Sequence, residues 1–473
     1  MAVAGVLMFF PDLLKKTGPP GMKVLPIEET EKYLLASIGV GGVGVYEVKF
    51  SPRGTYIAVP SAIFVELFDA NTLKSLKRYD VRDIKGSDGA YTVDFSPDEK
   101  FIALGGWDNA SYVTSDGERH TAAVTVLKTE TGELVRLFEG HDDNIYAVAF
   151  SPDGKMLASA GLDGTVKLWS METGEPIGVI DEAPDYQTIG VTFNVDDESY
   201  LEELKNCLQK YITRYDLEMV EFDKQLRKTQ TTQWWDGYFS FGLSKKYYDI
   251  VRIRAELKKE KYVTRVSVNL NPSGYIVWDL DFSPDGEMIA FTLSYQPMTH
   301  KVIVYSIARQ QIIKTIEQDD VAHQPGVYDI LFTSKENLLL ILGKGDYERE
   351  PDDPLEYEGI QDTVDIYETK GFQLINRIIH PHGIIKSFTL SPEHNILVTG
   401  TEPNCHVRFF DVKSGKMFLG PFRGHMHHVN GIDFNPVHGK TMVSGGGGVL
   451  FLWDYEKIYQ KYQEWLLKKL EEK

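Results

Sequence analysis

Apolar and polar residues alternate in short runs along most of the chain, and one arrangement recurs. An alternating run ends in a turn of the Ser-Pro-acidic-Gly type, and a second apolar run follows, as in IYAVAFSPDGKMLAS. Proline fixes φ, aspartate and serine bond nearby backbone, and glycine accepts positive φ, so each copy is predicted to form a β-hairpin. The seven copies lie at Val45–Val59, Ala90–Leu104, Ile145–Ser159, Ile276–Phe291, Val327–Ile341, Ile384–Gly400 and Val429–Gly445.

Further strands follow each hairpin. A third apolar run comes next, such as Thr165–Ser170, and in six copies a short polar turn leads to a fourth, such as Thr131–Phe138. Four strands per repeated unit is the pattern of a propeller blade, so we expect an all-β, seven-bladed β-propeller. The seventh copy supplies only three strands, and an open edge invites pairing with other chains. We therefore predict that Glu31–Ser37 is its fourth strand and closes the ring.

One long insertion interrupts the repeats. Phe150 and Phe282 are 132 residues apart, whereas Phe50 and Phe95 are 45 apart, so about 87 residues are extra. The pattern there predicts a strand at Thr188–Val195, a helix after it, and then several strands. We expect an inserted α+β module at residues 181–272, with the propeller at 31–180 and 273–455.

The two ends of the chain are both predicted to lie near blade seven. Residues 456–473 have the spacing of an amphipathic helix, with Tyr459, Tyr462, Leu466 and Leu470 on one side. Residues 1–30 are predicted to form an N-terminal arm whose first ten residues are apolar, and we expect it to pack against that helix through Phe9, Phe10, Leu13 and Leu14. The alternative is a helix that mediates dimerisation or binds a partner.

The third unit, Gly140–Ser170, resembles a WD repeat. The structural tetrad of that family maps onto His141, Ser159, Asp163 and Trp169, which implies a buried chain of hydrogen bonds. The seventh unit keeps His425, Ser444 and Trp453 but has glycines at Gly445–Gly448 in place of the acid, so its network should be incomplete. The resemblance implies a propeller that holds partner proteins, although this fold hosts many unrelated roles.

Composition narrows the classes of partner. The formal net charge is −19, so a phosphate backbone would be repelled on average and nucleic acid is not expected. The two cysteines, Cys207 and Cys405, are far apart and in no paired motif, which fits a reducing, cytoplasmic compartment. No run of about twenty apolar residues occurs, so no membrane span is expected, and no motif calls for a cofactor.

The long connections are all predicted to leave from one side of the propeller, the top face. They are the segments Gly105–Thr121, 181–272, Leu293–His300 and Gly343–Gln361. Candidate partner-binding residues there are Trp234 and Trp235 of the insert, and Asp346, Glu348, Asp352 and Asp353 of the blade-five loop. The alternatives are a tryptophan pair that anchors a core and an acidic loop that only faces water.

Histidines gather at the top of blades six and seven. His380, His382, His427 and His428 could form a metal site, because imidazole is a common zinc and copper ligand, but no carboxylate or cysteine has matching spacing. A ligand- or metal-binding protein, or an enzyme with its site at the channel mouth, is therefore the alternative function. No nucleophile elbow, phosphate loop or zinc-protease motif occurs. The sequence favours a non-catalytic scaffold that binds other proteins, of unknown identity, through its top face and insert.

Overall fold

The structure is a computed structural model of the chain. It describes residues 30–40, 44–81, 84, 89–106, 122–141, 143–181, 217–228, 235–245, 251–260, 263–269, 275–295, 299–317, 326–333, 338–344, 347–349, 357–359, 362–381, 384–393, 395–402, 405–425 and 428–471. In the strands of the insert and of the long blade-five connection, the description covers the backbone alone.

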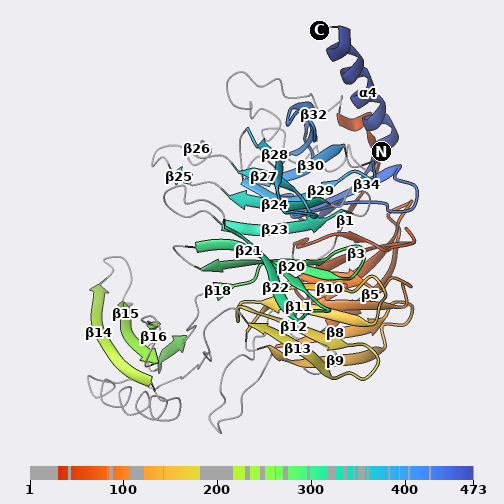
Figure 1. Ribbon diagram of the computed structural model, residues 1–473. Coiled ribbons are helices and arrows are strands. Elements are labelled where there is room, and N and C mark those ends of the chain that lie inside the picture. Colours follow the sequence, from red (N-terminus) through yellow and green to blue (C-terminus); the bar gives the residue numbers. More distant parts are fainter. Residues whose placement is uncertain are drawn as a thin grey trace.

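Seven antiparallel sheets make the blades of a propeller, as predicted (Figure 1). Blade 1 holds β2 (Lys49–Phe50), β3 (Tyr56–Ser61), β4 (Phe64–Asp69) and β5 (Ser75–Asp80). Blade 2 holds β6 (Thr92–Phe95), β7 (Phe101–Gly105), β8 (Ala122–Lys128) and β9 (Leu134–His141). Blade 3 holds β10 (Ile145–Phe150), β11 (Met156–Gly161), β12 (Thr165–Ser170) and β13 (Pro176–Asp181).

The remaining blades follow the same order from the inner strand outwards. Blade 4 holds β18 (Tyr275–Ile276), β19 (Leu280–Phe282), β20 (Met288–Tyr295), β21 (Thr299–Ser306) and β22 (Gln311–Glu317). Blade 5 holds β23 (Gly326–Phe332), β24 (Leu338–Lys344), β27 (Thr363–Glu368) and β28 (Leu374–Ile379). Blade 6 holds β29 (Ile384–Leu390), β30 (Ile396–Glu402), β31 (Val407–Asp411) and β32 (Met417–Phe422). Blade 7 holds β33 (Gly431–Phe434), β34 (Thr441–Gly446), β35 (Val449–Asp454) and β1 (Leu34–Gly39).

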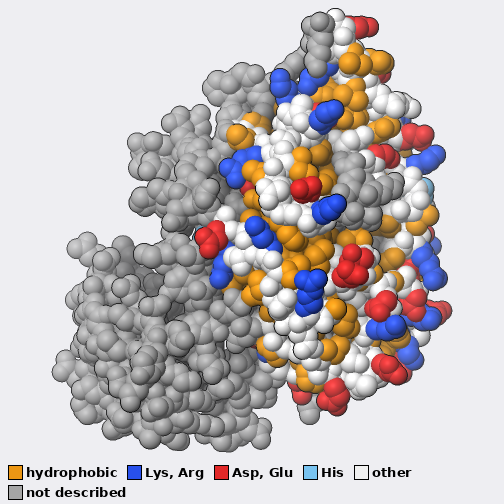
Figure 2. Space-filling model, in the orientation of Figure 1, with side chains coloured by type: hydrophobic (Ala, Val, Ile, Leu, Met, Phe, Trp, Pro, Cys, Tyr) orange, Lys and Arg blue, Asp and Glu red, His pale blue; other side chains and the backbone are white. Residues whose placement is uncertain are grey.

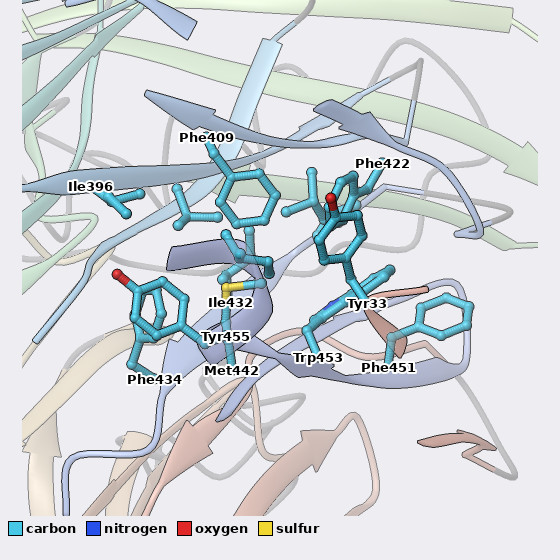
Figure 3. Packing of buried hydrophobic residues seen from close by; sticks show 14 of the residues in the cluster. Tyr33, Ile396, Phe409, Phe422, Ile432, Phe434, Met442, Phe451, Trp453 and Tyr455 are labelled. Atoms are coloured by element: carbon cyan, nitrogen blue, oxygen red, sulfur yellow. The ribbon is translucent and has the colours of Figure 1, made fainter. Parts of the chain in front are cut away.

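The hydrophobic core lies between the blades. Side chains alternate across each sheet, so every blade buries one row against each neighbour. The buried apolar residues accordingly fall into clusters that each join two adjacent blades. In the cluster between blades 6 and 7, Phe422 contacts both Phe409 and Trp453, and Tyr455 contacts Phe434 (Figure 3). The ring is therefore held by blade-to-blade packing.

The N-terminal strand closes the ring, as the sequence predicts. Strand β1 pairs antiparallel with β35, with Leu34 opposite Trp453 and Gly39 opposite Val449. The strand starts three residues later than predicted, because the Tyr33 amide donates to the Thr30 carbonyl in a turn, at 3.1 Å. The Tyr33 ring stacks on Phe422 at 5.0 Å and anchors the entry to the strand.

The insert contributes a separate four-stranded antiparallel sheet. It consists of β14 (Leu217–Lys228), β15 (Trp235–Lys245), β16 (Val251–Glu260) and β17 (Val263–Asn269), paired in chain order. The predicted strand at Thr188–Val195 and the predicted helix lie outside the described residues. The long blade-five connection contains a hairpin that the sequence did not predict, formed by β25 (Tyr347–Arg349) and β26 (Tyr357–Gly359).

The C-terminal helix α4 (Tyr455–Glu471) follows directly on β35. It buries Tyr455, Ile458 and Tyr462, whereas Leu466 and Leu470 are 37% and 70% exposed. The predicted stripe is thus displaced, because the helix begins with Tyr455 already wedged against Phe434, at 4.7 Å between ring centroids. The N-terminal arm, predicted to cover this helix, lies outside the described residues. In the part of the chain that is described, no helix meets the length and hydrophobicity that crossing a bilayer requires.

Candidate functional site at the mouth of the channel

A continuous hydrogen-bond chain crosses blade 3. The Trp169 Nε1–H donates to Ser159 Oγ at 2.8 Å, Ser159 Oγ meets His141 Nε2 at 2.7 Å, and His141 Nδ1 meets Asp163 Oδ2 at 2.8 Å. Tryptophan can only donate and a carboxylate can only accept, so Trp169 donates to Ser159 and His141 Nδ1 donates to Asp163. Burial by itself would raise the pKa of Asp163, but the charge of His141 and its hydrogen bond bring that pKa below the ordinary value. The structure therefore brings all four tetrad positions together.

Blade 7 has a shorter version of this chain. Trp453 Nε1 donates to Ser444 Oγ at 2.8 Å, and Ser444 Oγ meets His425 Nε2 at 2.8 Å. In place of an acid, the Gly446 carbonyl lies 3.4 Å from His425 Nδ1. Burial lowers the pKa of His425 to about 4, so this imidazole is neutral at pH 7.

Blade 6 fills the same positions with different residues. His380 is buried and its Nε2 lies 3.3 Å from Thr399 Oγ1, which corresponds to the His–Ser step of blade 3. Arg408, opposite Thr399 in the ladder, is fully buried. Its guanidinium donates to Thr401 Oγ1 at 3.1 Å and lies against His406 Nδ1 at 3.3 Å. Burial lowers the pKa of Arg408 to about 10.

Carboxylates on the inner strands join neighbouring blades around the central axis. The Phe50 amide donates to Asp433 Oδ2 at 2.7 Å, which ties blade 1 to blade 7. In the same way the Phe150 amide donates to Asp94 and the Phe332 amide to Asp281, at 2.7 and 2.8 Å. One layer nearer the top face, the Val93 amide donates to Glu47 at 2.9 Å and the Ile330 amide to Asp279 at 2.8 Å.

These carboxyl groups share little positive charge. In the part of the chain that is described, Lys49 is the cation that acts on these carboxyl groups. Its Nζ lies 3.8 Å from Asp94 Oδ1. Burial raises the pKa of Glu47 to about 7, and the charge of Lys49 opposes that rise only in part. Burial likewise raises the pKa of Asp281 to about 7 and of Asp433 to about 6. The inner strands around the central axis therefore carry several acidic groups with little positive charge beside them among the described residues.

Aromatic residues surround the top of this channel on five successive blades. They lie near the start of the inner strand in blades 1 to 5. We call these five residues the aromatic crescent: Tyr46, Tyr91, Tyr146, Trp278 and Tyr328. Ring centroids are 4.3 Å apart for Tyr46 and Tyr91, 5.0 Å for Tyr146 and Trp278, and 5.1 Å for Trp278 and Tyr328. All five side chains are partly exposed.

Backbone irregularities help to aim these rings. The ladder of blade 3 shifts register between Ile145 and Ala147, and that of blade 5 between Val327 and Asp329. Such bulges turn the unpaired side chain away from the regular pleat, here Tyr146 and Tyr328. The inner strands begin at the same end of each blade from which the insert and the blade-five connection leave. The crescent therefore lies on the top face, beside the long connections.

Blades 6 and 7 complete the rim with polar groups. Glu402 contacts Lys386 Nζ at 3.1 Å through one carboxylate oxygen and His428 Nδ1 at 2.8 Å through the other. Asn430 donates to the Val45 carbonyl at 2.7 Å and so connects blade 7 to blade 1. On this side of the mouth, Lys386 and His428 lie beside the carboxylate of Glu402. The acidic groups under the crescent have Lys49 alone beside them among the described residues.

The residues proposed from sequence fall in different parts of the structure. Trp235 lies in β15 and Glu348 in β25, where only the backbone is described; Trp234, Asp346, Asp352 and Asp353 lie outside the described residues. Of the four proposed metal ligands, His380 belongs to the blade-6 network and His428 pairs with Glu402; His382 and His427 are outside the description. Across the described ranges, no three histidine, cysteine or acidic side chains gather as metal ligands would. The metal site stays a prediction.

The crescent and the inner carboxylates were missed from the sequence, although the repeats contain a signal for both. Six of the seven inner strands end on phenylalanine, for example Phe50 in blade 1, and that of blade 6 ends on Leu390. Counting back four residues gives the crescent, and counting back one gives Asp94, Asp281 or Asp433. Comparing the repeats position by position would have revealed an aromatic column above an acidic one.

The fold and the hydrogen-bond chains together define a seven-bladed β-propeller of the WD type. The sequence model for the WD domain, G-beta repeat, matches residues 79–113, 132–170 and 417–454, which include most of blades 2, 3 and 7. The protein is thus a WD-repeat β-propeller, as its third unit indicates.

Stretches of this chain are similar in sequence to several known proteins. A serine-threonine kinase receptor-associated protein from Gallus gallus is 25% identical over 137 residues, 29% of this chain and 34% of the relative. Human WD repeat-containing protein 36 is 34% identical over 95 residues, 20% of this chain and 11% of the relative. The target of rapamycin complex subunit wat1 from Schizosaccharomyces pombe is 40% identical over 76 residues, 16% of this chain and 20% of the relative. The chain thus spans about a third or less of the length of these relatives.

Proposed function

We propose that this protein is a non-catalytic scaffold that binds partner proteins through its top face, with the channel mouth at the centre of the binding surface. The observation that carries the proposal is the aromatic crescent. Five large rings stand side by side, partly exposed, on inner strands that hydrogen bonds tie to their neighbours. Aromatic side chains on a rigid support are typical anchors of protein interfaces.

The relatives support the same class of function. One is named for its association with a receptor kinase and another as a subunit of a complex. The insert and the blade-five connection leave from the face that carries the crescent, so they are placed to extend the contact area. Figure 1 shows β14 to β16 and the β25–β26 hairpin on one side of the propeller, opposite α4.

Quantitative affinity purification of the tagged full-length chain tests this proposal. We expect the double substitution Tyr146→Ser and Trp278→Ser to remove most of the captured protein. The matched control is Ile177→Ser with Val179→Ser on the outer strand of blade 3, where both side chains are exposed, and it should leave capture unchanged. Equal capture by both variants would show that the channel mouth is not the binding surface.

A further inference from the structure

We infer that blade 6 binds one oxyanion of the phosphate class at the top of its outer half, where Arg408 and Arg423 provide the positive charge. Two sources present this chemistry, free inorganic phosphate and a phosphorylated side chain of a partner. The site is separate from the aromatic crescent, so the inference does not rest on the proposed scaffold function.

The strand ladder gathers the polar side chains of this site on one side of the blade-6 sheet. Arg408 in β31 lies opposite Thr399 in β30, and residues that pair directly point to the same side. Because side chains alternate along a strand, Thr401 and His406, each two positions nearer the top, point to that side as well. The hydrogen bond from Arg408 Nη1 to Thr401 Oγ1, at 3.1 Å, agrees with this placement.

Arg423 joins the group from the neighbouring strand. Val407 in β31 lies opposite Phe422 in β32, and both belong to the cluster that packs towards blade 7. His406 and Arg423, one position beyond them, therefore lie beside each other on the opposite side of the sheet. Burial, with the charges of Arg408 and Arg423, accordingly lowers the pKa of His406 to about 3. Arg423 is only partly buried, so this end of the group meets solvent.

Arg408 has more hydrogen-bond donors than its neighbours can accept. A guanidinium offers five N–H groups and accepts none, so the ring nitrogens that it meets act as neutral acceptors. Its Nη atoms lie 3.1 Å from Thr401 Oγ1, 3.4 Å from His380 Nε2 and 3.3 Å from His406 Nδ1. Arg408 Nε is fully buried and has no hydrogen-bond partner among the described residues.

The positive charge of Arg408 also has no carboxylate beside it in the ranges that the structure describes. Burial lowers its pKa, and no acidic group of those ranges opposes that effect. Glu402, the residue after Thr401, points to the other side of the sheet and contacts Lys386 and His428 instead. A buried charge without a counter-charge destabilises a fold, and departures of this kind are expected where a protein binds something.

An oxyanion with two negative charges fits this group better than other ligands do. The planar fork of an arginine matches the oxygen atoms of phosphate, and two arginines balance its two charges. A metal cation would be repelled by the same two side chains. The protein as a whole carries a net charge of −19 and repels anions, so only a local site of opposite sign can hold one. On the side of the molecule that Figure 2 shows, acidic and basic side chains are interspersed, so charge of one sign is not a general feature of the surface.

Titrations of the full-length chain followed by phosphorus NMR test the inference. The first probe is inorganic phosphate, and the second is N-acetyl-phosphoserine amide, which stands for a phosphorylated side chain. Sodium gluconate keeps the ionic strength constant, because exposed charges would otherwise be screened to different degrees. We expect saturable broadening of the phosphorus resonance, from which a Kd is obtained for each probe.

Three arginine variants separate the site from general electrostatic attraction. Arg423→Met removes the partly exposed guanidinium and Arg408→Met the buried one, and we expect each to weaken phosphate binding at least tenfold. Arg408→Met should fold, because replacing a buried charge by an apolar side chain of similar length is often stabilising. Arg53→Met is the matched control, since it removes the same charge from an exposed turn of blade 1, and it should change the Kd less than twofold. Thermal unfolding by circular dichroism checks that all three variants are folded.

The two probes distinguish the sources of the anion. Binding of both probes, lost together in Arg408→Met and Arg423→Met, supports a site that a phosphorylated partner reaches. Binding of inorganic phosphate alone, lost in the same variants, supports a site for the free anion. The inference is wrong if neither probe binds saturably, or if the two variants bind phosphate as well as the Arg53→Met control does.

Discussion

Blades 3 and 6 occupy equivalent places in the ring but hold their outer halves together in different ways. In blade 3 a tryptophan, a serine, a histidine and an aspartate form one hydrogen-bond chain that ends on a charge. In blade 6 phenylalanine stands at the tryptophan position, and the buried cation Arg408 stands where blade 3 has the partly exposed Lys167. Both blades nevertheless have four strands in the same order.

The comparison shows which interactions the blade requires. Blades 3 and 6 share apolar packing against both of their neighbours. In both, an amide of the inner strand also donates to a carboxylate of the preceding blade, which is Asp94 for blade 3 and Asp362 for blade 6. The polar network is therefore an addition that stabilises particular blades. In blade 6 that addition carries a cost, because Arg408 Nε is buried with no hydrogen-bond partner among the described residues.

The largest effect is expected from Ser159→Ala in blade 3. Ser159 Oγ is the centre of the chain, so its loss leaves both the Trp169 Nε1–H and His141 Nε2 buried without a partner. Each unsatisfied group costs about 1–3 kcal/mol, so we expect the free energy of unfolding to fall by about 2–4 kcal/mol. Urea denaturation at pH 7 measures the change. Ser170→Ala, on the same blade but half-exposed, is the control and should stay within about 0.5 kcal/mol.

A second test concerns the charge at the end of that chain. Asp163→Asn keeps the shape but replaces a charge-assisted hydrogen bond, so we expect a loss of about 1.5–3 kcal/mol at pH 7. The folded-state pKa of Asp163 lies below its unfolded value, so its stabilisation is present above about pH 4 and is lost as the pH falls further. Denaturation curves of the two proteins should therefore converge towards pH 2.5. A difference that stays constant from pH 7 to pH 2.5 would mean that the charge of Asp163 contributes nothing.

Much of the blade-level architecture could be predicted from the chain because its signals are local. The turn at Ser151–Gly154 specifies a hairpin by itself, and the missing fourth strand of blade 7 follows from counting strands. The hydrogen bond from the Phe150 amide to Asp94 spans two blades, so it depends on how neighbouring sheets stand around the axis. No pattern within one repeat specifies that angle.

The candidate site was harder to predict for a related reason. In the sequence Tyr146 looks like any alternating residue of a strand, and a register shift in the folded sheet changes the direction of its side chain. Its partner Trp278 is more than a hundred positions away, beyond the insert. Arg408 likewise has the position of a surface residue in its own strand, and only the packing of His380 and Thr401 around it makes it buried. The repeats mark the position of Tyr146, but the contacts that both residues make come from the tertiary structure.

The cost of the blade-6 arrangement can be measured with Arg408→Met. Burial lowers the pKa of the Arg408 guanidinium from its ordinary value, so the charged side chain destabilises the folded state at pH 7. Replacing a buried charge by an apolar side chain of similar length is often stabilising, and we expect the free energy of unfolding to rise by about 1 kcal/mol. Lys167→Met, the matched change in blade 3, should bring no gain, because Lys167 supports the charge of Asp163. A clear loss of stability in Arg408→Met would mean that the guanidinium stabilises its neighbours more than its burial costs.

The smallest effect is expected from Thr399→Val, the blade-6 counterpart of the serine change. The bond between Thr399 Oγ1 and His380 Nε2 is long, at 3.3 Å, and Phe410 beside it has no N–H to lose, in contrast to Trp169. Valine keeps the volume and the β-branched shape that suit a strand. Urea denaturation should therefore show a change of about 0.5 kcal/mol or less. The contrast with Ser159→Ala is the direct measure of how far the two blades differ, and equal losses at the two sites would mean that blade 6 depends on its histidine as strongly as blade 3 does.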